Sequence, residues 1–301
     1  LYEKLFGADG TQANAYFQYN KTNVEVKAIG TDTDIIIPAV YEGLPVTALS
    51  DNAFKEYAEV NSVVIPDSVT KIGKWAFRDC DNLNSVVIGN GVTIIDNQAF
   101  YGCGLISVEI GSSVESIGDL AFYGCGNLTS IIIPDSVTSI GNNAFAYCRR
   151  LVEVVNKSKH ITVEKDASSN GYIGYYALAV YNSDDTFVTT KLSNDNDYTI
   201  YTNGNEKILI GYNGTGTDLV LPSYINKINQ YAFYSCDSLT SVVIPDSVTT
   251  IGNGAFSSCT SLTSVTIGDS VTSIGSYAFS NCESLISVTI GDSVTSIGSY
   301  A

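Results

Sequence analysis

The sequence contains no methionine, one histidine, one tryptophan and six prolines, and it is short of basic residues. Its 15 lysines and arginines face 31 aspartates and glutamates, which gives a formal net charge of −16. Because such a chain repels a phosphate backbone and an anionic lipid surface, we expect no nucleic-acid partner. No apolar run approaches the ~20 residues of a membrane-spanning helix, so we expect no membrane insertion in this segment.

Motifs for catalysis or cofactor binding are also missing. His160 is the only histidine and lies in a polar stretch, so any Ser-His-Asp or Cys-His scheme would have to include it. We predict a surface or strand-edge histidine. No Gly-x-Ser-x-Gly elbow, phosphate-binding loop or His-Glu-x-x-His helix occurs, and Gly214 to Gly216 lacks a third glycine. We therefore expect neither an enzyme nor a bound cofactor.

What the chain does have is an internal repeat. An Ala-Phe dipeptide recurs every 22 or 23 residues, interrupted by one gap of 88 residues. It begins at Ala53, Ala76, Ala99, Ala121, Ala144, Ala232, Ala255 and Ala278. One unit buries too few apolar groups to offset the entropy of ordering its residues, whereas stacked units share a continuous core. The repeat therefore predicts a solenoid.

Each unit contains a short segment that alternates apolar and polar residues, such as 85–88 and 264–267. This period of two, with many β-branched residues, predicts one strand per turn and a parallel sheet. In each turn of the solenoid, an Asp-Ser β-turn would follow the strand on one side, and a curved segment with the Ala-Phe dipeptide, the Ala-Phe arc, would close the other side. Val86 and Ile88 should then face the core, and Ser85 and Val87 should face outward.

The fullest unit, 128–148, reads Leu-Thr-Ser-Ile-Ile-Ile-Pro-Asp-Ser-Val-Thr-Ser-Ile-Gly-Asn-Asn-Ala-Phe-Ala-Tyr-Cys. It resembles the BspA-like leucine-rich repeat, the type found in treponemal and trichomonad surface proteins, over about 33–156 and 218–301. The resemblance implies a right-handed leucine-rich-repeat solenoid. Ser68, Gly91 and Ser136 stand where the general repeat has asparagine or cysteine. We therefore expect the usual asparagine ladder to be absent.

The segment that leads into the first array occurs a second time, directly before the second array. Residues 24–38 align without gaps on 208–222 and share Gly, two Thr, Asp and Pro. We interpret this stretch as a β-hairpin cap, with Asn213-Gly214 as the turn in the second copy. The predicted organisation is an N-terminal β cap (1–32), a first array (33–156), a β-rich, Tyr-rich interruption with the second cap (157–217) and a second array (218–301). Strands are predicted at 161–163, 177–181 and 198–201, in a small module packed against the solenoid.

Cysteine and aspartate each recur at a fixed position of the repeat, so each should form a column in the stacked turns. The seven cysteines share one phase: Cys80, Cys103, Cys125, Cys148, Cys236, Cys259 and Cys282. Because parallel strands stack ~4.8 Å apart and a disulfide needs closer Cβ atoms, we predict a buried, reduced column. Five aspartates recur before serine: Asp67, Asp135, Asp246, Asp269 and Asp292. We expect them to form turns by bonding the local backbone, and not to bind calcium. At the loop acids Asp184, Asp185, Asp195 and Asp197 we also expect no calcium, because 195–197 lacks the glycine and terminal glutamate of a calcium loop.

The outward strand positions are the candidate binding residues. One predicted row is unusually apolar and holds Val64, Val87, Glu109, Ile132, Val243, Thr266 and Thr289, beside a serine column that includes Ser85, Ser130 and Ser264. Contiguous exposed apolar surface is typical of partner sites, although β-branched residues also suit a pleated sheet without any partner. Ten of the 20 tyrosines lie between 172 and 234. Tyr172, Tyr175, Tyr176, Tyr198 and Tyr201 form an alternative aromatic patch, for a glycan or for internal packing.

Three functions remain open from the sequence. BspA-like proteins are secreted or surface proteins associated with adhesion, so the resemblance implies an extracellular module that binds a host matrix protein, a host cell or another bacterial surface through the strand face. A structural spacer in a larger surface protein is the second possibility, and glycan binding by the Tyr-rich interruption is the third. The chain begins without methionine and Ala301 falls where another repeat would begin, so we expect a piece of a longer protein.

Overall fold

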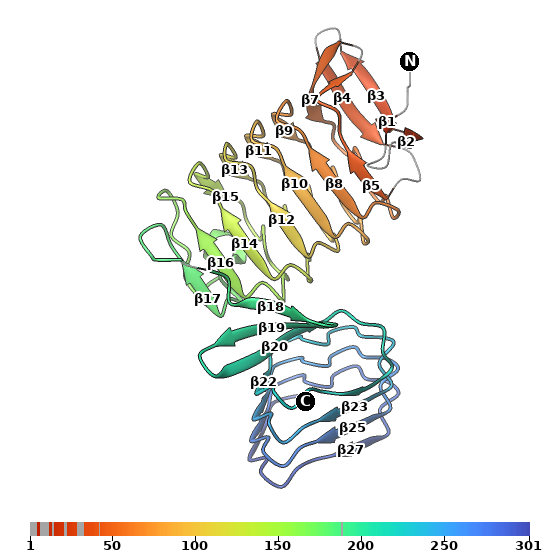
Figure 1. Cartoon of the computed structure of the whole chain (residues 1–301), viewed down its shortest axis with the longest axis vertical. Helices are drawn as coiled ribbons and strands as arrows, with labels where there is room; N and C mark the ends of the chain where they lie inside the picture. Colours follow the sequence, from red (N-terminus) through yellow and green to blue (C-terminus); the bar gives the residue numbers. More distant parts are fainter. Residues whose placement is uncertain are drawn as a thin grey trace. The chain divides into compact units, whose positions relative to one another are not determined.

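The alternating segments are strands in the structure, a computed structural model that describes residues 5–6, 12–13, 15–20, 23–28, 33–41, 43–187 and 189–301. The rest of the predicted cap at 1–32, including 29–32, lies outside the described residues. The fold prediction of stacked parallel-strand turns is confirmed, and Figure 1 shows the strands following one another as rungs. The chain divides into two compact units, Leu1–Val188 and Thr189–Ala301.

In the first unit the outward-facing strands form two parallel sheets. One sheet holds β5 (Asp34–Ile36), β8 (Ser62–Ile65), β10 (Ser85–Ile88) and β12 (Ser107–Glu109). The other holds β14 (Ser130–Ile133), β16 (Glu153–Asn156) and β17 (Ala179–Tyr181). The strand ladder is therefore interrupted between β12 and β14, beside the one repeat that is 22 residues long.

Each turn also contains a second, two-residue strand that the sequence analysis did not predict. In the first unit these strands are β9 (Lys71–Ile72), β11 (Ile94–Ile95), β13 (Ser116–Ile117) and β15 (Ser139–Ile140). They continue from β7 (Leu44–Leu49), which also pairs with β6 (Val40–Tyr41), and from the antiparallel hairpin of β3 (Ala15–Asn20) and β4 (Asn23–Ala28). A separate pair joins β1 (Leu5–Phe6) to β2 (Gln12–Ala13).

The second unit repeats this plan. Its outward sheet contains β21 (Asp218–Val220), β23 (Ser241–Ile244), β25 (Ser264–Ile267) and β27 (Ser287–Thr289). Its other sheet contains β18 (Leu192–Asp195), β19 (Tyr198–Asn203), β20 (Glu206–Tyr212), β22 (Lys227–Ile228), β24 (Thr250–Ile251), β26 (Ser273–Ile274) and β28 (Ser296–Ile297).

The repeated phenylalanines form a column through each core. In the first unit the ring centroids of Phe77, Phe100 and Phe122 are 5.1 Å apart at each step and the rings are nearly parallel. The arcs are also joined through their backbones, because the N–H of Phe77 donates to the carbonyl of Ala99 one turn further on (2.7 Å). This pairing explains why the dipeptide recurs: alanine leaves room for the neighbouring turn, and phenylalanine fills the core.

The two matched segments, 24–38 and 208–222, have the same role in both units. Each supplies a strand of the second sheet (β4 or β20) and then the first strand of the outward sheet (β5 or β21). Asp34 and Asp218 lie at the start of these outward strands and accept bonds from Ser62 (2.5 Å) and Ser241 (2.6 Å) of the next turn. Hydrogen bonds from Ser241, Thr240 and Thr217 hold the pKa of the Asp218 carboxyl below its usual value.

The predicted position of the second hairpin turn is wrong. The hairpin consists of β19 and β20, and Asn203 pairs with Glu206 across a two-residue turn in which Gly204 has φ +61°. Asn213 and Gly214 instead lie on the connection from β20 to β21, which belong to different sheets. Two Asn-Gly pairs occur ten residues apart, and only strand register decides between them.

The interruption is not one module packed against the solenoid. Residues up to 187 belong to the first unit as a further turn, since β17 pairs in parallel with β16 and the Phe145 N–H donates to the Gly171 carbonyl (2.7 Å). Residues from 189 onward belong to the second unit. Of the predicted strands, 161–163 is absent, while 177–181 and 198–201 correspond to β17 and β19. The four-residue α1 (Ser169–Tyr172) is the one helix among the described residues.

Candidate functional site

The predicted apolar strand row is exposed at every position named for it. In the first unit Val64 and Val87 are 38% and 37% exposed and lie in register with Glu109. Ile132 of β14 is 47% exposed. The outward row of the second unit contains Val243, Thr266 and Thr289, also exposed. The structure places these residues as two separate rows, one in each unit.

The row is longer than the sequence analysis proposed. Ile36 of β5 pairs with Val64 and is 47% exposed, and Val220 of β21 pairs with Val243 and is 72% exposed. The neighbouring serine column is less accessible, because Ser85, Ser130 and Ser264 are only half-exposed. The outward apolar residues, rather than the serines, therefore offer the larger contact surface.

A groove of about 740 Å³ lies at the carboxyl ends of β12, β14, β16 and β17 in the first unit. Part of its wall is apolar and comes from Ile110, Ile132, Pro134, Val155, Tyr181 and Phe187. Ile132, Val155 and Tyr181 are cross-strand neighbours, so the groove continues the line of the outward row, although Val155 itself is buried. Tyr181 and Phe187 meet edge to face, with ring centroids 5.2 Å apart.

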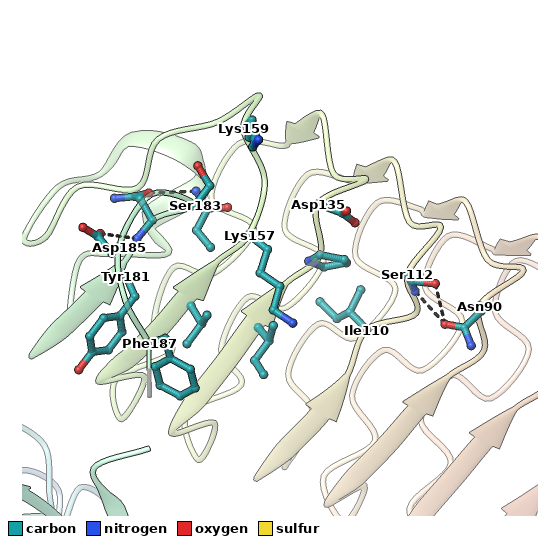
Figure 2. A pocket seen from close by; sticks show the side chains of 15 residues that line it. Asn90, Ile110, Ser112, Asp135, Lys157, Lys159, Tyr181, Ser183, Asp185 and Phe187 are labelled. Atoms are coloured by element: carbon teal, nitrogen blue, oxygen red, sulfur yellow. Dashed lines mark hydrogen bonds between the residues drawn. The ribbon is translucent and has the colours of Figure 1, made fainter. Parts of the chain in front are cut away.

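Two lysines line this groove. Lys157 follows β16, and Figure 2 shows its side chain extending across the groove between Phe187 and Ile110. Lys157 and Lys159 form no ion pair with any residue in the described part of the chain. Asp135 and Asp185 also line the groove, and the Asp185 carboxylate accepts the Asn182 N–H (2.7 Å). The groove therefore combines apolar walls with an unpaired ammonium group.

The loop that carries both lysines is held in place by buried polar side chains. Asn156 is 1% exposed; it donates to the Ile161 carbonyl (2.9 Å) and to Asn182 Oδ1 (2.9 Å) and accepts the Ser158 N–H (3.1 Å). Ser158 is fully buried and donates to the Val137 carbonyl (2.6 Å). His160 is exposed, as predicted, and its N–H donates to Ser158 Oγ (3.0 Å).

The residues of the alternative tyrosine patch divide between the two units. Tyr172, Tyr175 and Tyr176 belong to the first unit and contact each other, with centroids 5.4 and 4.9 Å apart. Tyr198 and Tyr201 belong to the second unit, where Tyr201 is only 3% exposed. Because a sugar platform needs accessible ring faces, Tyr201 cannot contribute to one.

The cysteine column is buried in five turns, but the prediction is wrong for Cys236 and Cys282, which are half-exposed. Cys236 lies in the first turn of the second array and Cys282 in one of its last turns, so each lacks part of the cover that inner turns receive. Six thiols donate to the carbonyl of a phenylalanine one turn earlier, at 2.9–3.1 Å, and the column is therefore a hydrogen-bonded one. Burial raises the pKa of Cys125 to about 12 and that of Cys148 well above its usual value.

We therefore expect the native thiols to react very unequally. Iodoacetamide at pH 8 should label Cys236 and Cys282 and leave Cys125 unmodified, since a pKa near 12 lowers its thiolate fraction roughly a thousandfold, and burial blocks access as well. Peptide mass spectrometry after timed labelling measures this, with the urea-unfolded chain as the control in which all seven react. Equal labelling of Cys125 and Cys236 would contradict the buried column.

The turn aspartates also bond differently from the prediction. Asp67 Oδ1 accepts the N–H of Asn90 in the next turn (2.6 Å), and Asp246 Oδ1 accepts the N–H of Asp269 (2.8 Å). Asn90 continues the series to the N–H of Ser112 (3.0 Å). Asp67 and Asp246 thus bond between turns, where local turn bonds were expected. No group of three or more His, Cys, Asp or Glu side chains in the described part of the chain is arranged to hold a metal ion.

The groove residues Lys157, Val155 and Phe187 were missed by the sequence analysis, which considered Tyr181 only as one of the ten tyrosines between 172 and 234. Val155 lies 23 residues after Ile132, so the repeat period was a usable signal for it. Tyr181 follows Val155 by 26 residues, in a turn without the Ala-Phe dipeptide, and no period reveals it.

Stacked parallel strands, a phenylalanine column and an outward strand row define a leucine-rich-repeat solenoid. The sequence matches the BspA type leucine rich repeat region in six copies, over residues 47–177 and 212–301. This is more than half of the chain, so the chain belongs to the BspA-type leucine-rich repeat family. No curated protein sequence matches it significantly.

Several solved structures are similar. A leucine rich cell surface protein of Faecalibacterium prausnitzii is 25% identical, with 92% of this chain and 93% of that one covered and a TM-score of 0.44. A leucine-rich repeat protein of Bacteroides ovatus is 24% identical, covering 95% and 78%, with a TM-score of 0.44. The leucine rich repeat protein of T. pallidum is 19% identical, covering 87% of each chain, with a TM-score of 0.44. Within the described residues of the present chain, no helix has the length and apolar character needed to cross a membrane.

Proposed function

We propose that this chain is a module of a secreted or cell-surface protein that binds other proteins by its outward strand face and so serves adhesion. The observation that carries the proposal is the exposed apolar row of Ile36, Val64 and Val87, with Ile132 in the groove at its end. Contiguous exposed apolar surface of this kind is typical of partner sites. Membership of the BspA-type family supports the same function.

The binding mechanism is recognition without bond chemistry. Parallel strands hold the residues of the row in register, and each turn adds a few contacts, so affinity comes from many weak interactions over a broad surface. The partner class we propose is an extracellular protein, either of a host matrix or of a cell surface. Enzymatic activity is no part of the proposal, and the prediction that the chain is not an enzyme stays a prediction.

Changing Val64, Val87, Ile132 and Val243 to glutamate is expected to lower binding to immobilised host matrix proteins at least about tenfold. The reason is that four charges would enter the surface that a partner must dehydrate. Biosensor binding of the purified chain to a matrix-protein and glycan panel measures the effect. Circular dichroism and the melting temperature establish that the variant is folded.

The matched control changes Val40, Ile94, Ile106 and Ile286 to glutamate, because these residues are also exposed and apolar but lie outside the row. It carries the same added charge and should bind like the native chain. Equal loss in both variants would indicate a general charge effect and contradict the strand face as the site. Binding to glycans alone would favour the cluster of Tyr172, Tyr175 and Tyr176, and no binding by the native chain would favour a spacer.

A further inference from the structure

We propose that the groove at the carboxyl ends of β12, β14, β16 and β17 binds an extended segment of the partner protein in which an acidic side chain stands next to a large apolar one. The proposal rests on the proposed function and assigns the ligand chemistry of one part of the strand face. Lys157 would pair with the acidic side chain, and the apolar wall around Ile132, Tyr181 and Phe187 would receive the other.

The shape of the groove fits such a segment. Its volume of about 740 Å³ lies in the range of pockets that enclose a ligand, unlike the flat row of Val64 and Val87. The interruption of the ladder between β12 and β14 lies within it, since Ile110 follows one strand and Ile132 belongs to the other. Apolar side chains from both sheets therefore line one hollow, where a bulky side chain would be buried.

The charges select a single carboxylate. Lys157 has no partner within the described part of the chain, and its ammonium group extends over apolar surface, where a charge pair is stronger than in bulk water. The chain as a whole has a net charge of −16, so the Lys157 ammonium group is a positive site on an acidic protein, and it favours an acidic group of the ligand. Lys159 also lines the groove, but Figure 2 shows it at the far end of the loop, away from the Lys157 ammonium group. Asp135 and Asp185 would repel a second carboxylate, so a polyacidic ligand fits poorly.

The backbone that carries Lys157 is already ordered by hydrogen bonds without a bound partner. Lys157 begins its loop with an N–H donated to the Ile133 carbonyl (2.9 Å), and the buried side chains of Asn156 and Ser158 hold the next residues. Little backbone entropy is then lost on binding.

A protein segment fits this groove better than a sugar. Asn90 and Ser112 bond to each other (3.0 Å), and Asn156 and Asn182 do the same (2.9 Å), so these four side chains are less available to hydroxyl groups. The rings of Tyr181 and Phe187 meet at 65°, so they form no flat platform. Apolar walls with the Lys157 ammonium group beside them match a peptide side-chain pair.

The test uses four fluorescein-labelled Gly/Ser decapeptides with central Glu-Phe, Gln-Phe, Lys-Phe or Glu-Ser, and fluorescence anisotropy with the whole chain. We expect Glu-Phe to bind at least tenfold more tightly than each of the other three. Lys157→Glu should reverse the preference to Lys-Phe. Lys74→Glu makes the same charge change at an exposed lysine outside the groove and should alter nothing. Phe187→Ser should remove the advantage of Glu-Phe over Glu-Ser.

Equal binding of Glu-Phe and Gln-Phe, an unchanged preference in Lys157→Glu, or no binding by any of the peptides would overturn the groove proposal. Charge-dependent binding confined to anionic glycans would overturn it too. The outcomes for the groove and for the proposed function can be told apart. If matrix-protein binding is lost in the strand-row variant but kept in Lys157→Glu, the strand face is supported as the binding site and the groove proposal is contradicted. If the peptides bind as expected and no matrix protein does, the groove stands and the adhesive function falls.

Discussion

Replacing Phe100 by alanine is expected to lower the free energy of unfolding of the first unit by about 3–5 kcal/mol. The ring is fully buried and lies between Phe77 and Phe122, with both centroid distances at 5.1 Å. Each turn of a solenoid contacts only its neighbours, so one cavity weakens two interfaces at once. Urea unfolding followed by Trp75 fluorescence measures the change, because the chain's single tryptophan lies in this unit.

Two variants separate this cavity effect from general damage. Phe100→Leu keeps most of the volume and should cost less than half as much. Ile94→Ser changes a 40% exposed side chain in the same unit and should stay within about 0.5 kcal/mol of the native chain. A loss below about 1 kcal/mol for Phe100→Ala would mean that the column is not what holds the turns together.

The parts of the fold that repeat were predictable from sequence for a physical reason. In a stack, each residue contacts the equivalent residue of the next turn. Equivalent positions therefore have the same environment, and the sequence shows the same type of residue there in most repeats. Val86 and Ile88 were assigned to the core and Val87 to the surface from alternation alone, and the structure places them so. The outward exposure of Val64, Ile132 and Val243 follows from the same rule.

The parts that occur once were not predictable in this way. The turn containing Tyr181 lacks the Ala-Phe dipeptide, so its place in the stack depends on tertiary pairing with β16. The choice between two Asn-Gly pairs for the hairpin turn depends on strand register. Lys157 gained significance only when the structure brought Ile110 and Phe187 to the same groove. These are long-range relations, which local pattern does not record.

Asn156 shows this difference most clearly. It lies in register with Ile133, at the position where other repeats bury isoleucine, such as Ile65 and Ile88. From the repeat alone, changing Asn156 to isoleucine would restore the consensus and stabilise the chain. The structure predicts the opposite result, because the asparagine side chain satisfies three polar groups in a buried place.

Asn156→Ile is therefore expected to lower the free energy of unfolding by about 2–4 kcal/mol, since each buried polar group left without a partner costs roughly 1–3 kcal/mol. Hydrogen exchange should speed up at the Ser158 amide, which loses its acceptor, and at Val163, which bonds to Asn182. Asn82→Ala removes an exposed asparagine bond to the Ala58 carbonyl and should cost at most about 1 kcal/mol. A gain in stability from Asn156→Ile would show that the loop of Lys157 is not held by this network, and the preparation of the groove would then need another source.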